Sequence, residues 1–426
     1  MNIFWFRRDL RLNNNRALFD SLSDDLTLPI FIFDKNILNK LPKNDKRVAF
    51  IHKTISELNK QLSSFNSGIK VLYDTPIEAF KKLLSEYSVS KVYANHDYEP
   101  YASARDSEIK SLLESHNVTF ETFKDQVIYE KNEVLKSDGT PYTVFTPYSK
   151  KWTERFNNES LKSFNSESLL SNIYSVTNEI ISLEEMGFLN NNYQYPSKEL
   201  NKSILSNYHN TRDIPSLLGT TRLSLHLRFG TISIRDLIKN ATANSTYLNE
   251  LIWREFYMMI LWHYPHVVTN SFKSKYDSIR WENNEEHIKL WKEGRTGYPI
   301  VDAGMRELNE KGYMHNRVRM ITASFFTKHL LCDWRIGEAY FAEKLLDYEL
   351  SSNNGGWQWA AGSGCDAAPY FRVFNPELQT KKFDPELKYI RKWVPEFENP
   401  FEYPQPIVEH KFARERALAR YKEALK

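Results

Sequence analysis

The first 123 residues alternate short apolar runs with stretches of helical periodicity, and this alternation constrains the fold more than any other feature of the chain. The apolar runs are rich in β-branched and aromatic residues, as buried strands are. The predicted strands are Asn2–Phe6, Leu26–Phe33, Ile69–Tyr73, Lys91–Asn95 and Val118–Phe123. Helical periodicity lies between them, for example in Val48–Leu62 and Pro76–Tyr87. The pattern predicts an N-terminal α/β domain built on a doubly wound parallel sheet.

Sheets of this kind bind ligands beyond the carboxyl ends of their strands. The first predicted strand is followed by Arg7-Arg8-Asp9-Leu10-Arg11, where a dinucleotide-binding chain would carry a glycine-rich turn. We therefore expect no standard dinucleotide site in this domain.

The length of 426 residues exceeds what one hydrophobic core usually serves, so we expect two domains. Residues 131–200 are rich in Asn, Ser and Glu with weak periodicity, which indicates an interdomain linker. It would join an α/β domain of residues 1–130 to an all-α domain of residues 201–426. The helical patterns of the second domain lie in Leu251–Tyr264, Val301–Lys311, Val318–Trp334 and Gly337–Leu346. The basic segment His410–Lys426 is expected to form a solvated helix, with a contact to DNA as the alternative.

The formal net charge of +3 permits a nucleic-acid partner without requiring one. The two cysteines, Cys332 and Cys365, give neither a disulfide framework nor metal-ligand spacing, which fits a reducing compartment. We recognise no signal peptide and no apolar run long enough to span a bilayer. We expect a cytoplasmic monomer with no metal site and no membrane contact.

Two tryptophans, Trp357 and Trp359, stand two residues apart in a glycine- and alanine-rich helical stretch. Residues so spaced on a helix point about 200° away from each other, so the indoles face opposite sides. Two neighbours that favour aromatic surface, such as a cofactor and a stacked base, would explain this arrangement. The alternative is a helix buried on both faces.

In two further segments, polar and aromatic side chains that could contact a nucleobase recur at helical spacing. Glu250, Trp253 and Tyr257 share one face, where a carboxylate could accept from a base N–H beside a stacking indole. The alternative is an aromatic core stripe with Glu250 at its solvent edge. Asn316 and Met320 also share a face, and could offer a base an amide and a soft thioether contact. The neighbouring Arg317 and Arg319 point elsewhere, one towards a phosphate and the other towards a carboxylate.

The segment Thr220-Thr221-Arg222-Leu223-Ser224 precedes a helical pattern and offers three hydroxyl groups and a guanidinium. Such a helix start suits a pyrophosphate, and plain N-capping is the alternative. A polar group ahead of the tryptophan pair completes the set: Asp347, Glu349, Asn353 and Asn354.

Several stretches of the chain resemble the photolyase/cryptochrome superfamily, and within it the class I cyclobutane pyrimidine dimer photolyases. The matching stretches are Trp5–Leu12, Thr296–Ala303, Asn316–Arg335 and Asn353–Phe374. They stand in the family's order without gaps, and the resemblance runs nearly from one end of the chain to the other.

The resemblance implies a light-driven DNA repair enzyme, a carbon–carbon lyase, whose helical domain binds FAD without a covalent bond. The reduced flavin, excited by blue light, would donate an electron to a pyrimidine dimer, the cyclobutane ring would split, and the electron would return. The dimer would leave the DNA duplex to reach the flavin. A cryptochrome-like photoreceptor that signals to a protein partner is the alternative.

The resemblance also implies roles for individual residues. Those that would hold the FAD phosphates and ribityl chain are Tyr208, Thr220, Thr221, Leu223 and Ser224. Asn353 would face flavin N5, and Arg319 would pair with Asp347 over the ring system, with Glu349 in place of the family's usual aspartate. Residues implied to contact the dimer or its phosphates are Glu250, Trp253, Arg254, Asn316, Arg317, Met320 and Trp359, with Arg212 and Arg372 as further candidates. A chain of Trp281, Trp334 and Trp357 would carry electrons from the surface to the flavin.

Other positions discriminate within the family. Six-four photolyases carry a histidine pair where this chain has Asn316 and Met320, so a cyclobutane dimer is the expected substrate. Tyr247 stands where a tryptophan is common. Departures in the domain that would hold an antenna chromophore are Asn14, Arg16 and Thr75. A folate, a deazaflavin and a flavin all remain open as the antenna, with Glu99 as a candidate contact.

Overall fold

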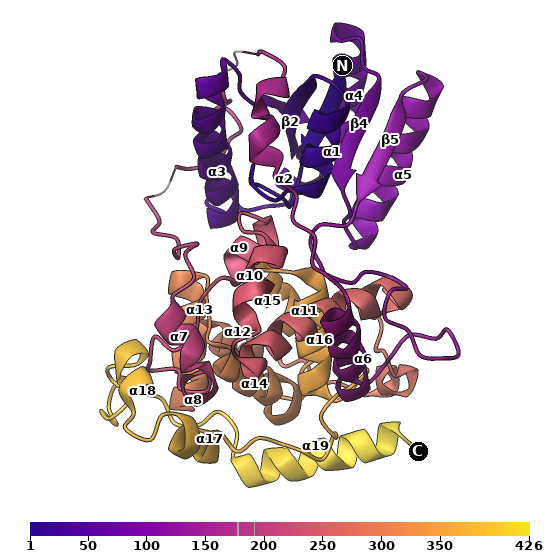
Figure 1. The fold of residues 1–426 in the computed structure, drawn as a ribbon. Helices are drawn as coiled ribbons and strands as arrows, with labels where there is room; N and C mark the ends of the chain where they lie inside the picture. Colours follow the sequence, from indigo (N-terminus) through magenta and orange to yellow (C-terminus); the bar gives the residue numbers. More distant parts are fainter. Residues whose placement is uncertain (177–178, 191) are drawn as a thin grey trace. The chain divides into compact units, whose positions relative to one another are not determined.

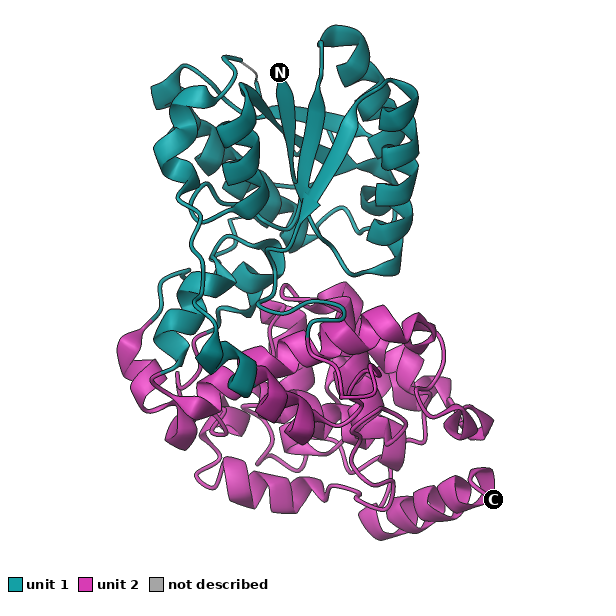
Figure 2. Ribbon diagram, turned by 45° about the vertical axis from the view of Figure 1, so that its right-hand side comes forward, with its two compact units in different colours: residues 1–133, 153–200, 222–242 teal, residues 134–152, 201–221, 243–426 magenta. Residues whose placement is uncertain are grey.

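The computed structural model describes residues 1–176, 179–190 and 192–426, which form two compact units (Figures 1 and 2). Unit 1 comprises residues 1–133, 153–200 and 222–242. Unit 2 comprises residues 134–152, 201–221 and 243–426. The chain therefore passes between the units several times.

Unit 1 contains a five-stranded parallel sheet in the order β3-β2-β1-β4-β5, with β1 at its centre (Figure 1). The strands are β1 (Asn2–Phe6), β2 (Thr27–Asp34), β3 (Lys70–Asp74), β4 (Lys91–Asn95) and β5 (Thr119–Phe123). Each lies within one residue of its predicted bounds. The prediction of an α/β domain with a parallel sheet is confirmed.

Helices pack on both faces of this sheet. The helices of unit 1 are α1 (Arg16–Asp24), α2 (Lys35–Leu38), α3 (Lys46–Leu62), α4 (Pro76–Glu86), α5 (Pro100–Ser115), α9 (Ser224–Phe229) and α10 (Ile234–Ala241). On one face, α4 and α5 bury Phe80 and Ile109 against the sheet residues Ile3, Trp5 and Ile30. α1 packs against β1 and β4. Two short turns complete the unit, η1 (Ser63–Phe65) and η2 (Ser166–Asn172).

The arginines that follow β1 are held in ion pairs. Arg7 donates to both carboxylate oxygens of Asp106 at 2.6 Å. Arg8 lies 2.9 Å from Glu99, which also accepts from Arg228 at 2.8 Å. The place of a phosphate-binding turn is thus taken by paired charges, and Glu99 is already bound by two guanidinium groups.

Unit 2 is helical, as predicted for the C-terminal part of the chain. Its helices are α7 (Lys202–Ser206), α8 (Tyr208–Thr211), α11 (Ser245–His263), α12 (Glu285–Glu293), α13 (Pro299–Lys311), α14 (Asn316–Ser324), α15 (Trp334–Lys344), α16 (Leu350–Ala361), α17 (Pro376–Phe383), α18 (Lys388–Trp393) and α19 (His410–Ala424), with the short turns η3 (Pro265–Val268), η4 (Ser274–Ser278) and η5 (Phe325–His329). The core is formed mainly by α13 to α16. No helix in the described parts of the chain is long and apolar enough to cross a bilayer.

The prediction of a single helix over Val318–Trp334 is wrong. α14 ends at Ser324, a π-turn follows in η5, and Leu331 adopts a left-handed conformation with φ of 50°. Asp333 then caps α15 by accepting from the backbone N–H of Arg335. The apolar spacing continues across the break because both sides of it face one core, and periodicity alone does not reveal a change of axis.

The segment 131–200, expected to be a linker, contains helix α6 (Phe145–Asn158). Phe145, Tyr148 and Trp152 are buried along it. Their spacing is that of one helix face, which the surrounding Asn- and Ser-rich composition obscured.

The C-terminal helix α19 also differs from the prediction of a solvated helix. Ala413, Ala417 and Tyr421 form a buried stripe on it. Its basic residues occupy other positions, so the helix packs along one narrow stripe and is otherwise exposed to solvent.

Candidate functional site

α11 presents Glu250, Trp253 and Tyr257, and all three side chains are half-buried while Leu251 and Ile252 are buried. Glu250 is not a free carboxylate at the solvent edge, because its Oε1 accepts from Nη1 of Arg212 at 2.6 Å. Burial raises the pKa of Glu250, and the positive charge of Arg212 opposes that shift.

The next residue, Asp213, extends this ion pair to α14. Its Oδ1 accepts from Nη2 of Arg317 at 2.8 Å, and the Arg317 guanidinium also lies 3.7 Å from the sulfur of Met320. Arg212 and Asp213 therefore connect the predicted dimer contacts on α11 with those on α14. Asn316 is the first residue of α14 and is exposed.

Trp253 is one half of a stacked pair. The centroids of its ring and of the Phe145 ring lie 3.7 Å apart, with planes 6° from parallel. The buried ring of Phe256 packs edge-on against both. One face of the Trp253 indole is thus covered by a residue of α6.

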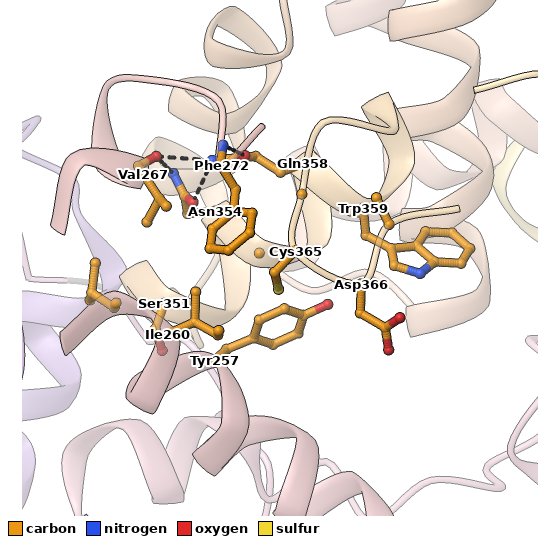
Figure 3. A pocket seen from close by; sticks show the side chains of 14 residues that line it. Tyr257, Ile260, Val267, Phe272, Ser351, Asn354, Gln358, Trp359, Cys365 and Asp366 are labelled. Carbon is orange, nitrogen blue, oxygen red and sulfur yellow. Dashed lines mark hydrogen bonds between the residues drawn. The ribbon is translucent and has the colours of Figure 1, made fainter. Parts of the chain in front are cut away.

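Trp359 lines a small pocket of about 20 Å³ between α11, α16 and the loop after α16 (Figure 3). Tyr257, Cys365 and Asp366 line the same pocket, and the hydroxyl end of Tyr257 lies on the side of Asp366. Trp359 is half-buried, packs against the core cluster of unit 2, and lies at a centroid distance of 6.4 Å from the tilted Phe374 ring.

Trp357 faces the core instead. Its indole is 2% exposed and packs at a centroid distance of 4.9 Å against Phe341. A Cβ at Gly337 would lie 2.1 Å from Trp357, so glycine is required there. The two indoles therefore point in different directions, as the spacing predicted. Trp334 lies in the same core cluster as Trp357, and Trp281 packs against that cluster.

Two polar pairs lie close to the tryptophan helix. Arg319 donates to both oxygens of Asp347 at 2.9 and 3.1 Å, so the ion pair expected from the resemblance is present. Asn353 donates its amide N–H to Oε1 of Glu338 at 2.8 Å. Burial raises the pKa of Glu338, against the effect of this hydrogen bond.

Glu349 and Asn354 have structural contacts. Glu349 caps α16 by accepting from the backbone N–H of Ser352. Asn354 donates to the carbonyl oxygen of Val267 at 2.8 Å. These contacts account for both residues in the folded chain.

The hydroxyls of Thr220 and Thr221 do not cap a helix. They lie 3.3 Å and 3.2 Å from the hydroxyls of Tyr313 and Tyr247, and the Tyr247 ring packs edge-on against Tyr208 at 5.0 Å. Burial raises the pKa of Tyr247 to about 12, so this hydroxyl stays protonated.

The helix after this segment, α9, begins at Ser224 and has only six residues. No side chain caps it, which excludes the N-capping alternative for these hydroxyl groups. Arg222 has a φ of 54°, and Leu223 is buried. The segment is therefore a turn with hydroxyl groups on it and not a long helix start.

Two consecutive glycines interrupt the surface of α16, and only one is explained by packing. A Cβ at Gly355 would lie 2.2 Å from the Tyr257 ring. A Cβ at Gly356 would meet no atom within 4 Å. Glycine costs about 1 kcal/mol relative to alanine inside a helix, and no contact among the described residues explains a glycine at position 356.

The remaining predicted residues lie at the surface or near it. Arg254 is half-buried, and Arg372 is exposed with its guanidinium 5.7 Å from the centroid of the Phe374 ring. Sequence reasoning missed Phe145, Asp213, Glu338 and Asp366. Each acts through a partner at least 15 residues away. Only Phe145 carried a local signal, the helical spacing to Tyr148 and Trp152.

This chain is similar to known photolyases in sequence and in fold. Residues 2–166 match the family model of DNA photolyase, and residues 247–401 match that of the FAD binding domain of DNA photolyase. The deoxyribodipyrimidine photo-lyase of Escherichia coli (strain K12) is 36% identical over 100% of this chain and 99% of its own length.

Two solved structures extend the likeness to the fold. A class III photolyase from Agrobacterium tumefaciens superposes with a TM-score of 0.88 at 32% identity, covering 99% of this chain and 97% of that one. An archaeal photolyase from Sulfolobus tokodaii, solved with two FAD molecules, gives a TM-score of 0.80 at 33% identity over 99% and 100% of the chains. With full-length relatives, both family models and the fold in agreement, this chain belongs to the photolyase/cryptochrome family.

Proposed function

We propose that the protein is a class I photolyase that binds FAD and repairs cyclobutane pyrimidine dimers in DNA by light-driven electron transfer. The observation that carries the proposal is the connected set on α11 and α14, in which Arg212 and Asp213 join Glu250 to Arg317 and Met320. An acid, a thioether and an indole gathered in this way suit a pair of bases removed from a duplex.

The charged groups of this set have separate tasks. Glu250 accepts from the imide N–H of a thymine, more strongly when the carboxyl group is ionised, and Arg212 favours that state. Arg317 lies against a lesion phosphate once that phosphate replaces Asp213 as its partner, and Arg254 supplies a second contact to the backbone. Since phosphate contacts dominate affinity for DNA, lesion binding weakens as the salt concentration rises.

The residues near α16 fit an FAD. Gly356 leaves open space beside the helix, and Asn353 is held there by Glu338, so its amide carbonyl is fixed in orientation. The Arg319–Asp347 pair provides a fixed guanidinium whose charge favours an electron-rich ring system. Thr220 and Thr221, with Tyr208 beside them, would hold the ribityl chain and phosphates. When bound, the reduced flavin supplies the electron, and the protein supplies its orientation and electrostatic surroundings.

The test uses a duplex with a single thymine dimer. The purified protein, with its flavin chemically reduced, is mixed with the duplex, and recovery of thymine absorbance is followed under blue light and in darkness. We expect light-dependent recovery and tighter binding of the damaged duplex than of the same duplex without the lesion.

Glu250→Ala is the variant that tests the role of the carboxylate in the same assay. It should retain FAD and lose lesion affinity, because one charge-assisted hydrogen bond worth ~1.5–3 kcal/mol is removed. A wild-type protein that reduces its flavin in light and leaves dimers intact would instead be a photoreceptor of the cryptochrome kind.

We also propose a light-harvesting second chromophore. The Sulfolobus tokodaii photolyase was solved with two FAD molecules, and this finding was taken to imply a novel light-harvesting cofactor in that protein. Heat release of the pigments, followed by chromatography against folate, deazaflavin and FAD standards, identifies the compound. A stoichiometry of one FAD and no other pigment would contradict the proposal.

A further inference from the structure

The stacked pair of Phe145 and Trp253 joins the two sides of the lesion site proposed above. Phe145 is the first residue of α6, and its ring covers one face of the Trp253 indole at a centroid distance of 3.7 Å. A base that stacks on Trp253 therefore has only the other face available. The contact with the Phe145 ring also restricts rotation of the Trp253 indole about its Cβ–Cγ bond.

The backbone of Phe145 reaches the opposite side of the site. Its N–H donates to Oδ2 of Asp366 at 3.0 Å. Asp366 lies in the loop after α16, and it lines the same pocket as Trp359 and Tyr257 (Figure 3). One residue thus contacts Trp253 on α11 through its side chain and the loop beyond Trp359 through its backbone.

Phe145 is itself held firmly in unit 2. The Tyr148 ring of α6 packs on Phe256 at 5.2 Å, and Nε1 of Trp152 donates to Oε1 of Glu255 at 2.6 Å. Trp152 and Glu255 are both buried. The position of the Phe145 ring is therefore set by contacts along α6 and does not depend on a bound base.

We propose that Phe145 is a positioning residue for lesion binding, which holds the Trp253 indole ready for stacking and ties it to the loop that follows Trp359. This role rests on the proposed function. Pre-orientation of an aromatic contact lowers the entropy lost on binding, so the effect is expected in affinity for the flipped dimer. Undamaged DNA presents no flipped base and should bind independently of Phe145.

The experiment measures dissociation constants for a duplex with one thymine dimer and for the same duplex without it. Phe145→Leu keeps an apolar side chain of similar size and removes the stack. We expect it to weaken lesion binding about two- to tenfold, the range of an aromatic pair, and to leave affinity for undamaged DNA unchanged. FAD content and the repair yield per bound dimer should match the wild type, and Phe145→Tyr should restore lesion affinity.

Trp152→Phe is the control on the same helix, because it removes the hydrogen bond to Glu255 while the Tyr148–Phe256 contact and the backbone bond to Asp366 still hold Phe145. It should keep the wild-type preference for damaged DNA. The positioning role is overturned if Phe145→Leu keeps that preference, or if Trp152→Phe loses it to the same extent. A wild-type protein without any preference for the lesion would overturn the proposed function itself, and the wild-type measurement shows this before any variant is compared.

Discussion

The Glu250 carboxyl group is subject to two opposing influences. Burial on α11 raises its pKa above the ordinary value of 4.5, and the Arg212 guanidinium at 2.6 Å acts against that rise. Asp213 adds a repulsion in the same direction as burial. Ionisation of Glu250 near neutral pH therefore depends mainly on Arg212, with Arg317 acting in the same direction.

Replacing that arginine tests the balance. In Arg212→Met the pKa of Glu250 should rise further, so the ionised form is lost at a higher pH as the solution is acidified. We expect the acid limb of lesion affinity, measured by titration between pH 5 and pH 8, to move to higher pH than in the wild type. An unchanged limb, with affinity lower at every pH, would mean that Arg212 acts on DNA alone.

Gly356 gives a second test at the scale of one residue. Gly356→Ala removes the helical cost of glycine and should stabilise the flavin-free protein by up to about 1 kcal/mol. The added methyl group occupies the open space beside Asn353, so FAD content after purification should fall. The ratio of flavin to protein absorbance and a urea unfolding curve measure the two effects.

Gly355→Ala is the contrasting variant, because its Cβ would meet the Tyr257 ring at 2.2 Å. It should destabilise the protein. Full flavin occupancy in Gly356→Ala would show that this part of α16 does not face the cofactor.

Among the elements, the π-turn η5 links three others through one buried amine. Nζ of Lys328 donates to the carbonyl oxygens of Ala361 at 2.8 Å and Tyr370 at 3.2 Å, and lies 3.7 Å from the centroid of the Tyr421 ring. These residues belong to α16, to the loop after it and to α19. Burial lowers the pKa of Lys328 from 10.5 to about 7.

The lowered pKa predicts how stability depends on pH. Between about pH 7 and pH 10 the unfolded chain binds a proton at Lys328 that the folded chain does not, so the free energy of unfolding rises with pH. The slope is ~1.4 kcal/mol per pH unit, and below about pH 7 the contribution is constant. Urea unfolding of the wild type and Lys328→Met at pH 7, 8 and 9 should give a difference that grows in favour of the wild type. Parallel pH profiles would show that the amine titrates near its ordinary value.

At the scale of the whole molecule, the three tryptophans of the predicted electron chain come from distant parts of the sequence. Trp334 begins α15, Trp357 lies in α16, and both are buried in one cluster against which Trp281 packs. Trp281 is half-buried and meets the Tyr421 ring edge-on at 6.0 Å. This order from a partly exposed indole to buried ones suits transfer from the surface inwards.

If the three tryptophans carry electrons to the flavin, loss of Trp281 should affect photoreduction of the flavin and not repair of the dimer. Trp281→Phe should leave the flavin oxidised under blue light in the presence of a reductant, followed by its visible absorbance. Chemical reduction of the same variant should restore repair of a dimer-containing duplex. Loss of repair after chemical reduction would refute the assignment of Trp281 to the electron chain.

Much of the architecture was predictable because it depends on local periodicity. All five strands lie within one residue of their expected bounds, since apolar runs between turns define them without reference to distant residues. The prediction of one helix over Val318–Trp334 was wrong for the same reason, its dependence on local periodicity. Residues on both sides of η5 face the same core, so the apolar spacing continues across it. The left-handed conformation of Leu331 does not alter that spacing.

The sequence by itself determined the α/β and helical classes, the family, and the opposite directions of Trp357 and Trp359, because backbone geometry and the order of motifs suffice for these. Only the tertiary structure decided the partners of the charged and aromatic groups: Arg212 with Glu250, Asp213 with Arg317, Glu338 with Asn353 and Phe145 with Trp253. These pairs are 15 to 108 positions apart in the chain. No local window contains both members, and their meeting depends on how the helices between them pack.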